Sequence, residues 1–139
     1  MKTSLKIIEQ AATEKWMKPL AIFHLSKYLF ANSVIYDYRK RMNQLANRLN
    51  ISTKTFYNYL AILREKGLIE EKGNDKNLHL TAIKSIKYDL GDKNICKIDI
   101  ASSDEVNQII CKLFAKLIEN HMKKMAFTRA LKEYGRRDL

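Results

Sequence analysis

The side chains best suited to chemistry lie on one face of a short basic helix, which the sequence predicts from Thr53 to just before Gly67. Lys54 and Asn58 stand four residues apart, so they share that face. A lysine ammonium donates hydrogen bonds, and an asparagine amide both donates and accepts them. Groups of this kind bind anions and the hydrogen-bonding edges of a partner. The pattern therefore predicts recognition rather than catalysis.

Sequence patterns that mark catalytic or metal sites are missing. The chain has no glycine-rich phosphate loop, Cys-x-x-Cys, His-x-x-x-His or nucleophile elbow. We expect His24 in the core, His79 on the solvent side of a strand and His121 on a helix surface, none of them a metal ligand. Cys96 and Cys111 are isolated in apolar-patterned segments and are expected to be reduced, buried thiols. We expect no enzyme, no metal and no cofactor.

Positive charge is concentrated around the basic helix. The chain of 139 residues carries a net charge of +11, and residues 39–87 hold eleven Lys and Arg against four acids. A charged face is often only solvated surface. Here it coincides with a helical recognition pattern, which favours an anionic partner such as nucleic acid.

The basic helix is the second of two helices predicted within residues 42–69. Apolar residues recur at helical spacing as far as Leu49, and Ile51 then breaks the period. Ser52 can accept hydrogen bonds from the free N–H groups of a new helix that begins at Thr53. In that helix Phe56, Leu60 and Leu63 form an apolar side, opposite the polar side.

A β-hairpin is predicted directly after these helices. Gly67 suits the left-handed residue that ends a helix. Residues 68–72 and 78–82 have strand patterns, and residues 73–77 between them are rich in turn formers. In the second strand the apolar residues alternate with His79 and Thr81.

The flanking segments supply the supporting elements. Residues 4–16 predict a short amphipathic helix with an apolar stripe of Leu5, Ile8, Ala12 and Trp16. A core helix should begin near Pro19 and end near Asn32, and residues 33–38 have the β-branched and aromatic composition of a strand.

Two further segments follow the hairpin. Residues 84–101 predict a connecting arm or extra hairpin, with Cys96, Ile98 and Ile100 alternating as in a half-buried strand. A capping-box spacing from Ser102 to Glu105 opens a long helix that reaches about residue 134. We expect its apolar stripe to join two copies of the chain into a homodimer. The residues expected to form the joint are Ile110, Leu113 and Leu117, with help from Leu5, Ile8 and Trp16. The alternative is that the stripe folds back onto its own N-terminal helix.

The two helices and the hairpin resemble the helix-turn-helix of winged-helix DNA-binding domains, in the broad group of GntR-like, DeoR-like and MarR-like bacterial regulators. The resemblance covers about residues 17–85 and does not select one family. It is carried by Leu45, Ala46, Leu49, Ile51, Ser52, Thr55, Phe56, Leu60, Leu63, Gly67, Leu68 and Ile69. It implies a mostly α fold with a small β-wing, a winged helix-turn-helix core plus an N-terminal helix and a long C-terminal helix. The expected divisions are a helix at 1–16, the DNA-binding domain at 17–85, an arm at 86–101 and a dimerisation helix at 102–139.

The resemblance also implies how the polar residues would act. Lys54 and Asn58 would read base edges in the major groove, because lysine can donate to guanine and asparagine can pair with adenine. Phosphates and the flanking groove would be contacted by Arg39, Arg41, Gln44, Thr55, Tyr57, Lys72 and Lys76, and Thr53 and Asn74 complete the expected DNA-binding set.

We therefore expect a cytoplasmic, sequence-specific double-stranded DNA-binding protein that regulates transcription, with no membrane association. Two alternatives stay open. One is a replication-initiation or mobile-element DNA-binding protein, and the other is a winged-helix module for protein–protein interaction. The sequence does not indicate an effector ligand.

Overall fold

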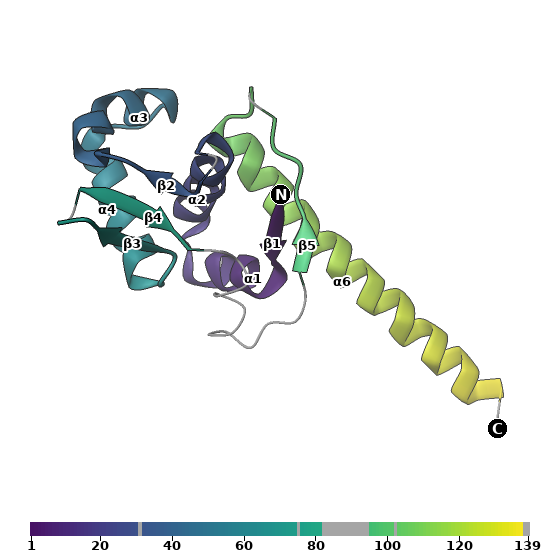
Figure 1. Ribbon diagram of the computed structural model, residues 1–139. Helices are drawn as coiled ribbons and strands as arrows, with labels where there is room; N and C mark the ends of the chain where they lie inside the picture. Colours follow the sequence, from purple (N-terminus) through teal and green to yellow (C-terminus); the bar gives the residue numbers. More distant parts are fainter. Residues whose placement is uncertain (31, 75, 82–94, 102, 138–139) are drawn as a thin grey trace.

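The computed structural model describes residues 1–30, 32–74, 76–81, 95–101 and 103–137. These residues are mostly helical, with a small antiparallel sheet of three strands and a two-stranded one (Figure 1). The elements in order are β1 (Lys2–Ser4), α1 (Leu5–Glu14), α2 (Met17–Leu29), β2 (Val34–Ile35), the 3-10 helix η1 (Tyr38–Arg41), α3 (Met42–Arg48), α4 (Thr53–Glu65), β3 (Ile69–Lys72), β4 (Asn77–Leu80), β5 (Ile95–Lys97) and α6 (Val106–Arg137). The prediction of a mostly α fold with a small β element is confirmed.

Helix α2 is the centre of the core. It packs against α1, α4 and α6, and residues 19–26 are all buried. Because it is covered on every side, its sequence is apolar nearly all round instead of amphipathic. The helix begins at Met17, two residues before Pro19, and ends at Leu29.

The three-stranded sheet has the order β2-β4-β3, with both pairings antiparallel. The predicted hairpin strands are confirmed as Ile69–Lys72 and Asn77–Leu80, and the last predicted strand residue, Ala82, lies outside the described residues. The strand expected at 33–38 has only two residues. It ends there because Asp37 adopts a left-handed conformation, with φ 49°, and turns the chain into η1.

The boundaries of α4 and of the turn that precedes it agree with the sequence. Helix α4 begins at Thr53, and the Ser52 hydroxyl accepts a hydrogen bond from the Thr55 N–H at 3.1 Å. Asn50 takes a left-handed conformation in the turn, and Gly67, with φ 77°, closes α4 in the conformation that favours glycine.

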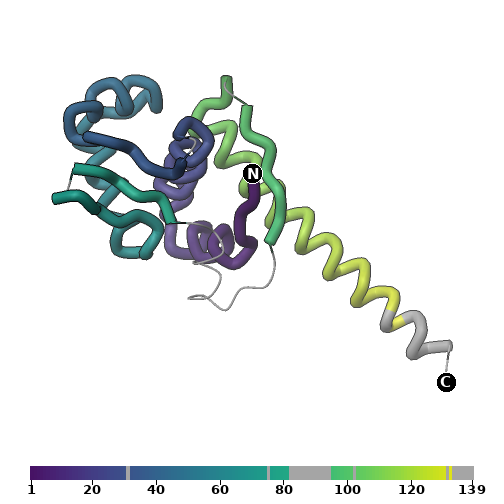
Figure 2. The backbone as a smooth tube through the Cα atoms, in the orientation of Figure 1, coloured from purple at the N-terminus to yellow at the C-terminus, as the bar shows by residue number. Residues whose placement is uncertain are grey.

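The N-terminus forms a strand that the sequence did not indicate. Strand β1 pairs antiparallel with β5, so that Lys2 lies opposite Lys97, and the Ile98 N–H donates to the Met1 carbonyl at 2.8 Å. The half-buried strand expected around Cys96 is thus confirmed, and its neighbour is the N-terminal end of the chain (Figure 2). Residues 82–94 of the expected arm lie outside the described residues.

Helix α1 belongs to the same core as the helices that follow it. Its buried residues are Ile7, Ile8 and Ala11. Of these only Ile8 belongs to the predicted apolar stripe, so the buried face is shifted from the predicted one. At its end Glu14 accepts hydrogen bonds from the Trp16 indole at 2.9 Å and from the Lys66 ammonium at 2.7 Å. These bonds lower the pKa of Glu14, chiefly through Lys66, and they tie α1 to the end of α4.

Helix α6 begins inside the domain and then leaves it. Ile109 and Leu113 are fully buried, whereas every residue from 121 to 130 is exposed. The helix has 32 residues, which corresponds to about 48 Å, and its C-terminal half extends away from the other elements (Figure 1). The predicted cap Ser102 lies outside the described residues, and the Glu105 N–H instead donates to the Gln108 side chain at 2.7 Å.

Three residues expected to join two copies are buried in their own chain. Ile8, Trp16 and Leu113 belong to the core, because α1 and α2 cover the beginning of α6. Ile110 and Leu117 are partly buried against the same core, and Leu5 is partly exposed. The predicted dimer surface is therefore wrong for Ile8, Trp16 and Leu113, because this part of α6 packs onto its own N-terminal helix.

Candidate nucleic-acid interface

Helix α4 presents a polar face to solvent. Lys54, Tyr57 and Asn58 are exposed, while Phe56 and Leu60 are buried on the opposite side. The helix is held from behind by α2 and β3. Lys54 and Asn58, expected at base edges, and Tyr57, expected at phosphates or the flanking groove, are thus exposed on a supported helix.

The two threonines at the start of α4 are engaged within the protein. The Thr53 hydroxyl donates to the Asn43 side chain on α3 at 3.0 Å. The Thr55 hydroxyl accepts from the Ser52 hydroxyl at 2.8 Å, and both threonines are half-buried. Thr53 thus connects α4 to α3, and Thr55 bonds within the N-terminal cap of α4, although it was expected to contact phosphate.

The fold brings the segment after β2 to the tip of the β3–β4 hairpin. The Tyr38 N–H donates to the Lys76 carbonyl at 3.1 Å, and the Asp37 N–H donates to the Asn77 side chain at 3.2 Å. The exposed basic residues of η1 therefore start next to Lys76 of the hairpin. These two groups of basic residues are far apart in the sequence, but the pairing of the strands brings them together.

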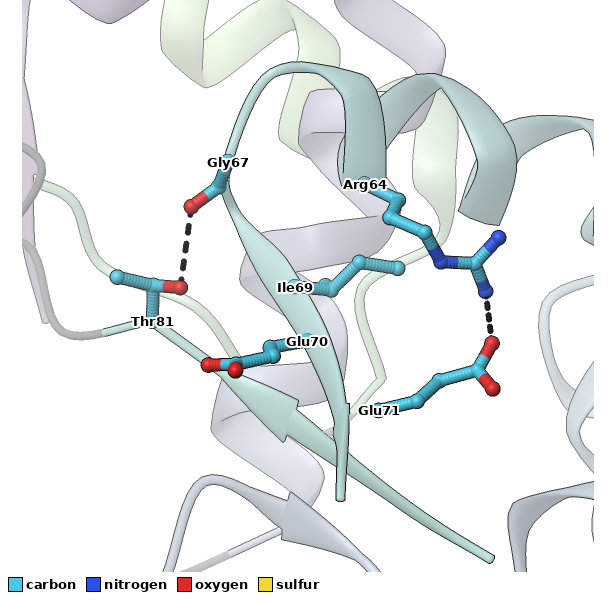
Figure 3. A pocket seen from close by; sticks show the side chains of 6 residues that line it. All are labelled: Arg64, Gly67, Ile69, Glu70, Glu71 and Thr81. Atoms are coloured by element: carbon cyan, nitrogen blue, oxygen red, sulfur yellow. Dashed lines mark hydrogen bonds and ion pairs between the residues drawn. The ribbon is translucent and has the colours of Figure 1, made fainter. Parts of the chain in front are cut away.

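Arg39 is tethered by an acidic side chain. Its guanidinium lies 3.4 Å from one oxygen of Glu71, and Arg64 of α4 bonds the other oxygen (Figure 3). Arg39 also donates to the Tyr38 hydroxyl at 3.3 Å, and burial raises the pKa of that hydroxyl. Arg39 remains exposed, but Glu71 offsets part of its charge, so it is a weaker phosphate contact than the sequence implied.

A shallow hollow of about 630 Å³ lies beside this ion pair (Figure 3). It is lined by Arg64, Gly67, Ile69, Glu70, Glu71 and Thr81. Arg64 is bonded to Glu71, and the Thr81 hydroxyl donates to the Gly67 carbonyl at 3.1 Å. With these groups already paired, the hollow has no arrangement of acid, base and nucleophile that would support catalysis.

The other expected contacts are exposed on the same group of elements. Arg41 ends η1, Gln44 lies on α3, and Lys72 ends β3 with its ammonium 3.9 Å from Glu70. Asn74 lies in the hairpin loop with a left-handed φ of 58°. In Figure 1 the α3 helix and the hairpin tip lie at the end of the molecule opposite the free end of α6.

Tyr36 was missing from the expected set. It is 54% exposed in the turn that joins β2 to η1. Lys40, between Arg39 and Arg41, is also exposed in η1. The alternation of Ile35, which is buried, with its neighbour could have indicated that Tyr36 faces outward. Its position beside the hairpin tip depends on the pairing of β2 with β4, which the sequence does not reveal.

Other kinds of site are not evident in the described part of the chain. Within it, no group of three or more His, Cys, Asp or Glu side chains is placed to hold a metal ion. None of the helices described is both long and apolar enough to cross a membrane. His24 is fully buried as expected, with its Nε2 2.9 Å from the Thr3 hydroxyl. Cys111, expected to be buried, is exposed.

Comparisons with known proteins do not assign this chain to a family. No protein-family model, curated protein or solved structure matches this chain.

Proposed function

We propose that this chain is a sequence-specific double-stranded DNA-binding protein with a winged helix-turn-helix core, and that it regulates transcription by occupying its operator. The observation that carries the proposal is α4, a capped helix with Lys54, Tyr57 and Asn58 exposed on one face. The element order α2-β2-α3-α4-β3-β4 around the sheet β2-β4-β3 supports the winged-helix assignment.

Helix α4 has the dimensions and side chains that major-groove recognition requires. The major groove of B-DNA is about 12 Å wide and admits an α-helix. Lys54 would donate to guanine O6 and N7, and Asn58 would pair with adenine N6 and N7. Tyr57 would lie against sugar or a thymine methyl group. The Ser52 cap and the bond from Thr53 to Asn43 keep the helix start in place, which limits the entropy lost on binding.

The basic residues around the hairpin tip would hold the phosphate backbone. Lys40, Arg41, Lys72 and Lys76 are exposed near the junction of η1 and the hairpin. Contacts of this type set position and affinity but carry no sequence information. Arg39 would contribute less, because Glu71 already accepts its guanidinium.

The salt dependence of binding tests the proposal. If four to eight basic side chains contact phosphates, log affinity should fall with log salt at a slope of roughly −4 to −7. Fluorescence anisotropy with a labelled duplex between 50 and 300 mM salt measures that slope. The absence of binding at low salt, or a flat response, would exclude DNA as the partner.

A charge-matched pair of variants locates the interface. Arg41→Ala with Lys76→Ala removes two positive charges near the hairpin, and Lys116→Ala with Lys123→Ala removes two from α6. The first pair should make the slope less steep by about 2, and the second should leave it unchanged. Equal changes would mean that the net charge, and not this surface, drives binding.

Genomic-site enrichment tests the regulatory part. A transcriptional regulator should be recovered at promoters. Recovery at a replication origin instead would retain DNA binding and replace the proposed role.

A further inference from the structure

Part of α6 carries an apolar strip that the protein leaves uncovered. Its members are Phe114, Ile118, Met122 and Met125, each between 41% and 63% exposed. Their spacing of four, four and three residues places them on one side of the helix. The strip begins where the core contacts of Ile109 and Leu113 end. Large apolar side chains grouped in this way indicate a surface that another molecule covers.

Three lysines of α6, Lys112, Lys116 and Lys123, lie away from this strip. At 3.6 residues per turn, Lys116 and Lys123 fall on the far side of the helix from Ile118. Lys123 is paired with Glu119 at 3.3 Å, and Lys112 is paired with Asp104. Phe127 is also on the far side, because nine residues from Ile118 make two and a half turns. Between residues 112 and 125 the helix therefore has an apolar side and a separate basic side.

The spacing within the strip suits a second α6. Cys111, Ala115, Ile118, Met122 and Met125 follow one another at steps of four, three, four and three residues. A repeat of this kind, averaging 3.5 residues, is the seam along which two helices pack side by side. A two-fold dimer brings the same surface from each copy together, so a helix with such a seam can cover itself.

Four large apolar side chains, each 41–63% exposed, form the strip. The largest exposed apolar patch on a typical monomer is only roughly 300–600 Å². A standard interface buries about 800 Å² per partner. The rest of the buried area can come from the polar residues that border the seam along the protruding part of the helix. These residues also lose solvent contact when two helices lie together.

We propose that a second copy of this chain covers the strip, with the two α6 helices antiparallel and the two-fold axis near residues 118–122. Arg129 continues the strip at its C-terminal end. In a parallel pair the two copies of Arg129 would face each other, and two domains from chains of net charge +11 would meet at one end. An antiparallel pair places Arg129 opposite the residue-111 end of the other helix and separates the domains.

The mass of the full chain in solution, measured without nucleic acid, tests the dimer. Sedimentation from 1 to 100 µM in 0.15 M salt should show a dimer that dissociates on dilution. Ile118→Lys or Met122→Lys should weaken the association at least tenfold, because each puts a charge into the seam. Circular dichroism should show unchanged helix content, since both side chains are exposed in the monomer.

A matched control variant lies on the same helix. Phe127 is 65% exposed and Ile118 is 63% exposed, but they point in opposite directions. Phe127→Lys should therefore leave the dimer intact. A wild-type chain that stays monomeric at 100 µM, or a Phe127→Lys chain that dissociates as readily as Ile118→Lys, would overturn the proposal.

Disulfide formation tests whether the two α6 helices are antiparallel or parallel. In a Cys96→Ser chain, an antiparallel pair holds the two copies of Cys111 far apart, and a parallel pair brings them together. Adding Arg129→Cys should produce a rapid cross-link between positions 111 and 129. A control with Arg129→Cys and Cys111→Ser should cross-link slowly. Rapid linkage of Cys111 to its own copy would overturn the antiparallel arrangement.

The dimer and DNA binding are independent. The sedimentation test contains no DNA, and a monomeric chain could still bind a single site through α4. If both hold, two copies of α4 would read two half-sites, and a palindromic target would be favoured.

Discussion

Helix α4 and the protruding half of α6 both present a face to solvent, but the two faces differ. On α4 the large apolar residues Phe56, Leu60 and Leu63 are buried, and the exposed face is polar or basic. On α6 the exposed face includes Ile118 and Met122. Water solvates an exposed lysine well, so its exposure alone does not imply a partner. A strip of large apolar side chains in water does imply one.

Because of this difference, the two regions need different measurements to show that each has a partner. The basic surface around α4 needs a binding measurement, because its residues are stable in water with or without DNA. The strip on α6 needs a measurement of mass, because its exposure in a monomer is itself unfavourable. Helix α2 contacts α4 and α6 in one core, and the protruding half of α6 lies beyond that core.

The largest expected effect is a difference in stability between substitutions in the two halves of α6. Leu113→Ala should destabilise the fold by about 2–5 kcal/mol, because it leaves a cavity in a fully buried site. Ile118→Ala should cost less than about 0.5 kcal/mol at 1 µM, where the chain is expected to be monomeric and the residue exposed. Urea unfolding of both variants measures the difference. Equal losses would contradict the division of α6 into a core half and a free half.

The second effect concerns pH and the buried His24 of α2. The pKa of His24 is lowered to about 3, chiefly by burial and to a smaller degree by the positive charges of Lys27 and the N-terminal amine. The ordinary value is about 6.5 in the unfolded chain, so acid protonates the unfolded state first. Stability is full above pH 6.5 and is lost as pH falls toward 3. Between pH 7 and pH 5 the loss should be about 2 kcal/mol.

Urea unfolding at the two pH values checks this. The pH dependence should disappear in His24→Gln, whatever the stability of that variant. His121→Gln, which changes an exposed histidine of α6, is the control and should keep the wild-type dependence. An unchanged dependence in His24→Gln would assign the effect to another group.

The third effect separates base reading from phosphate contact. Asn58→Ala should cost about 1–3 kcal/mol on the specific site and relax the preference at one base pair. Lys76→Ala should weaken binding to specific and random duplexes about equally. Anisotropy competition with both duplexes measures the two losses. If Asn58→Ala weakened both equally, α4 would not be the reading helix.

The smallest effect concerns the start of α4. Ser52→Ala removes the acceptor for the Thr55 N–H and should cost about 0.5–2 kcal/mol of stability. Ser52→Asp keeps an acceptor and should cost much less. Thermal unfolding of the two variants compares them, and equal losses would show that the cap contributes nothing measurable.

The sequence alone determined the elements whose signals are local. The beginning of α4 follows from Ser52, its end from the left-handed Gly67, and the hairpin from two patterned strands around a turn. For the candidate site, helical spacing was enough to place Lys54, Tyr57 and Asn58 on one exposed face. These features depend on hydrogen bonds and backbone preferences within a few residues, which adjacent sequence reveals.

Tertiary structure decided the features that join distant residues. It paired β1 with β5, placed the end of β2 at the hairpin tip and gave Arg39 and Arg64 a shared acceptor in Glu71. It also decided which stripe of α6 is buried. A helical pattern shows that an apolar side must be covered, but the choice among several coverings depends on the shape of every other packed element, and only the assembled core settles that choice.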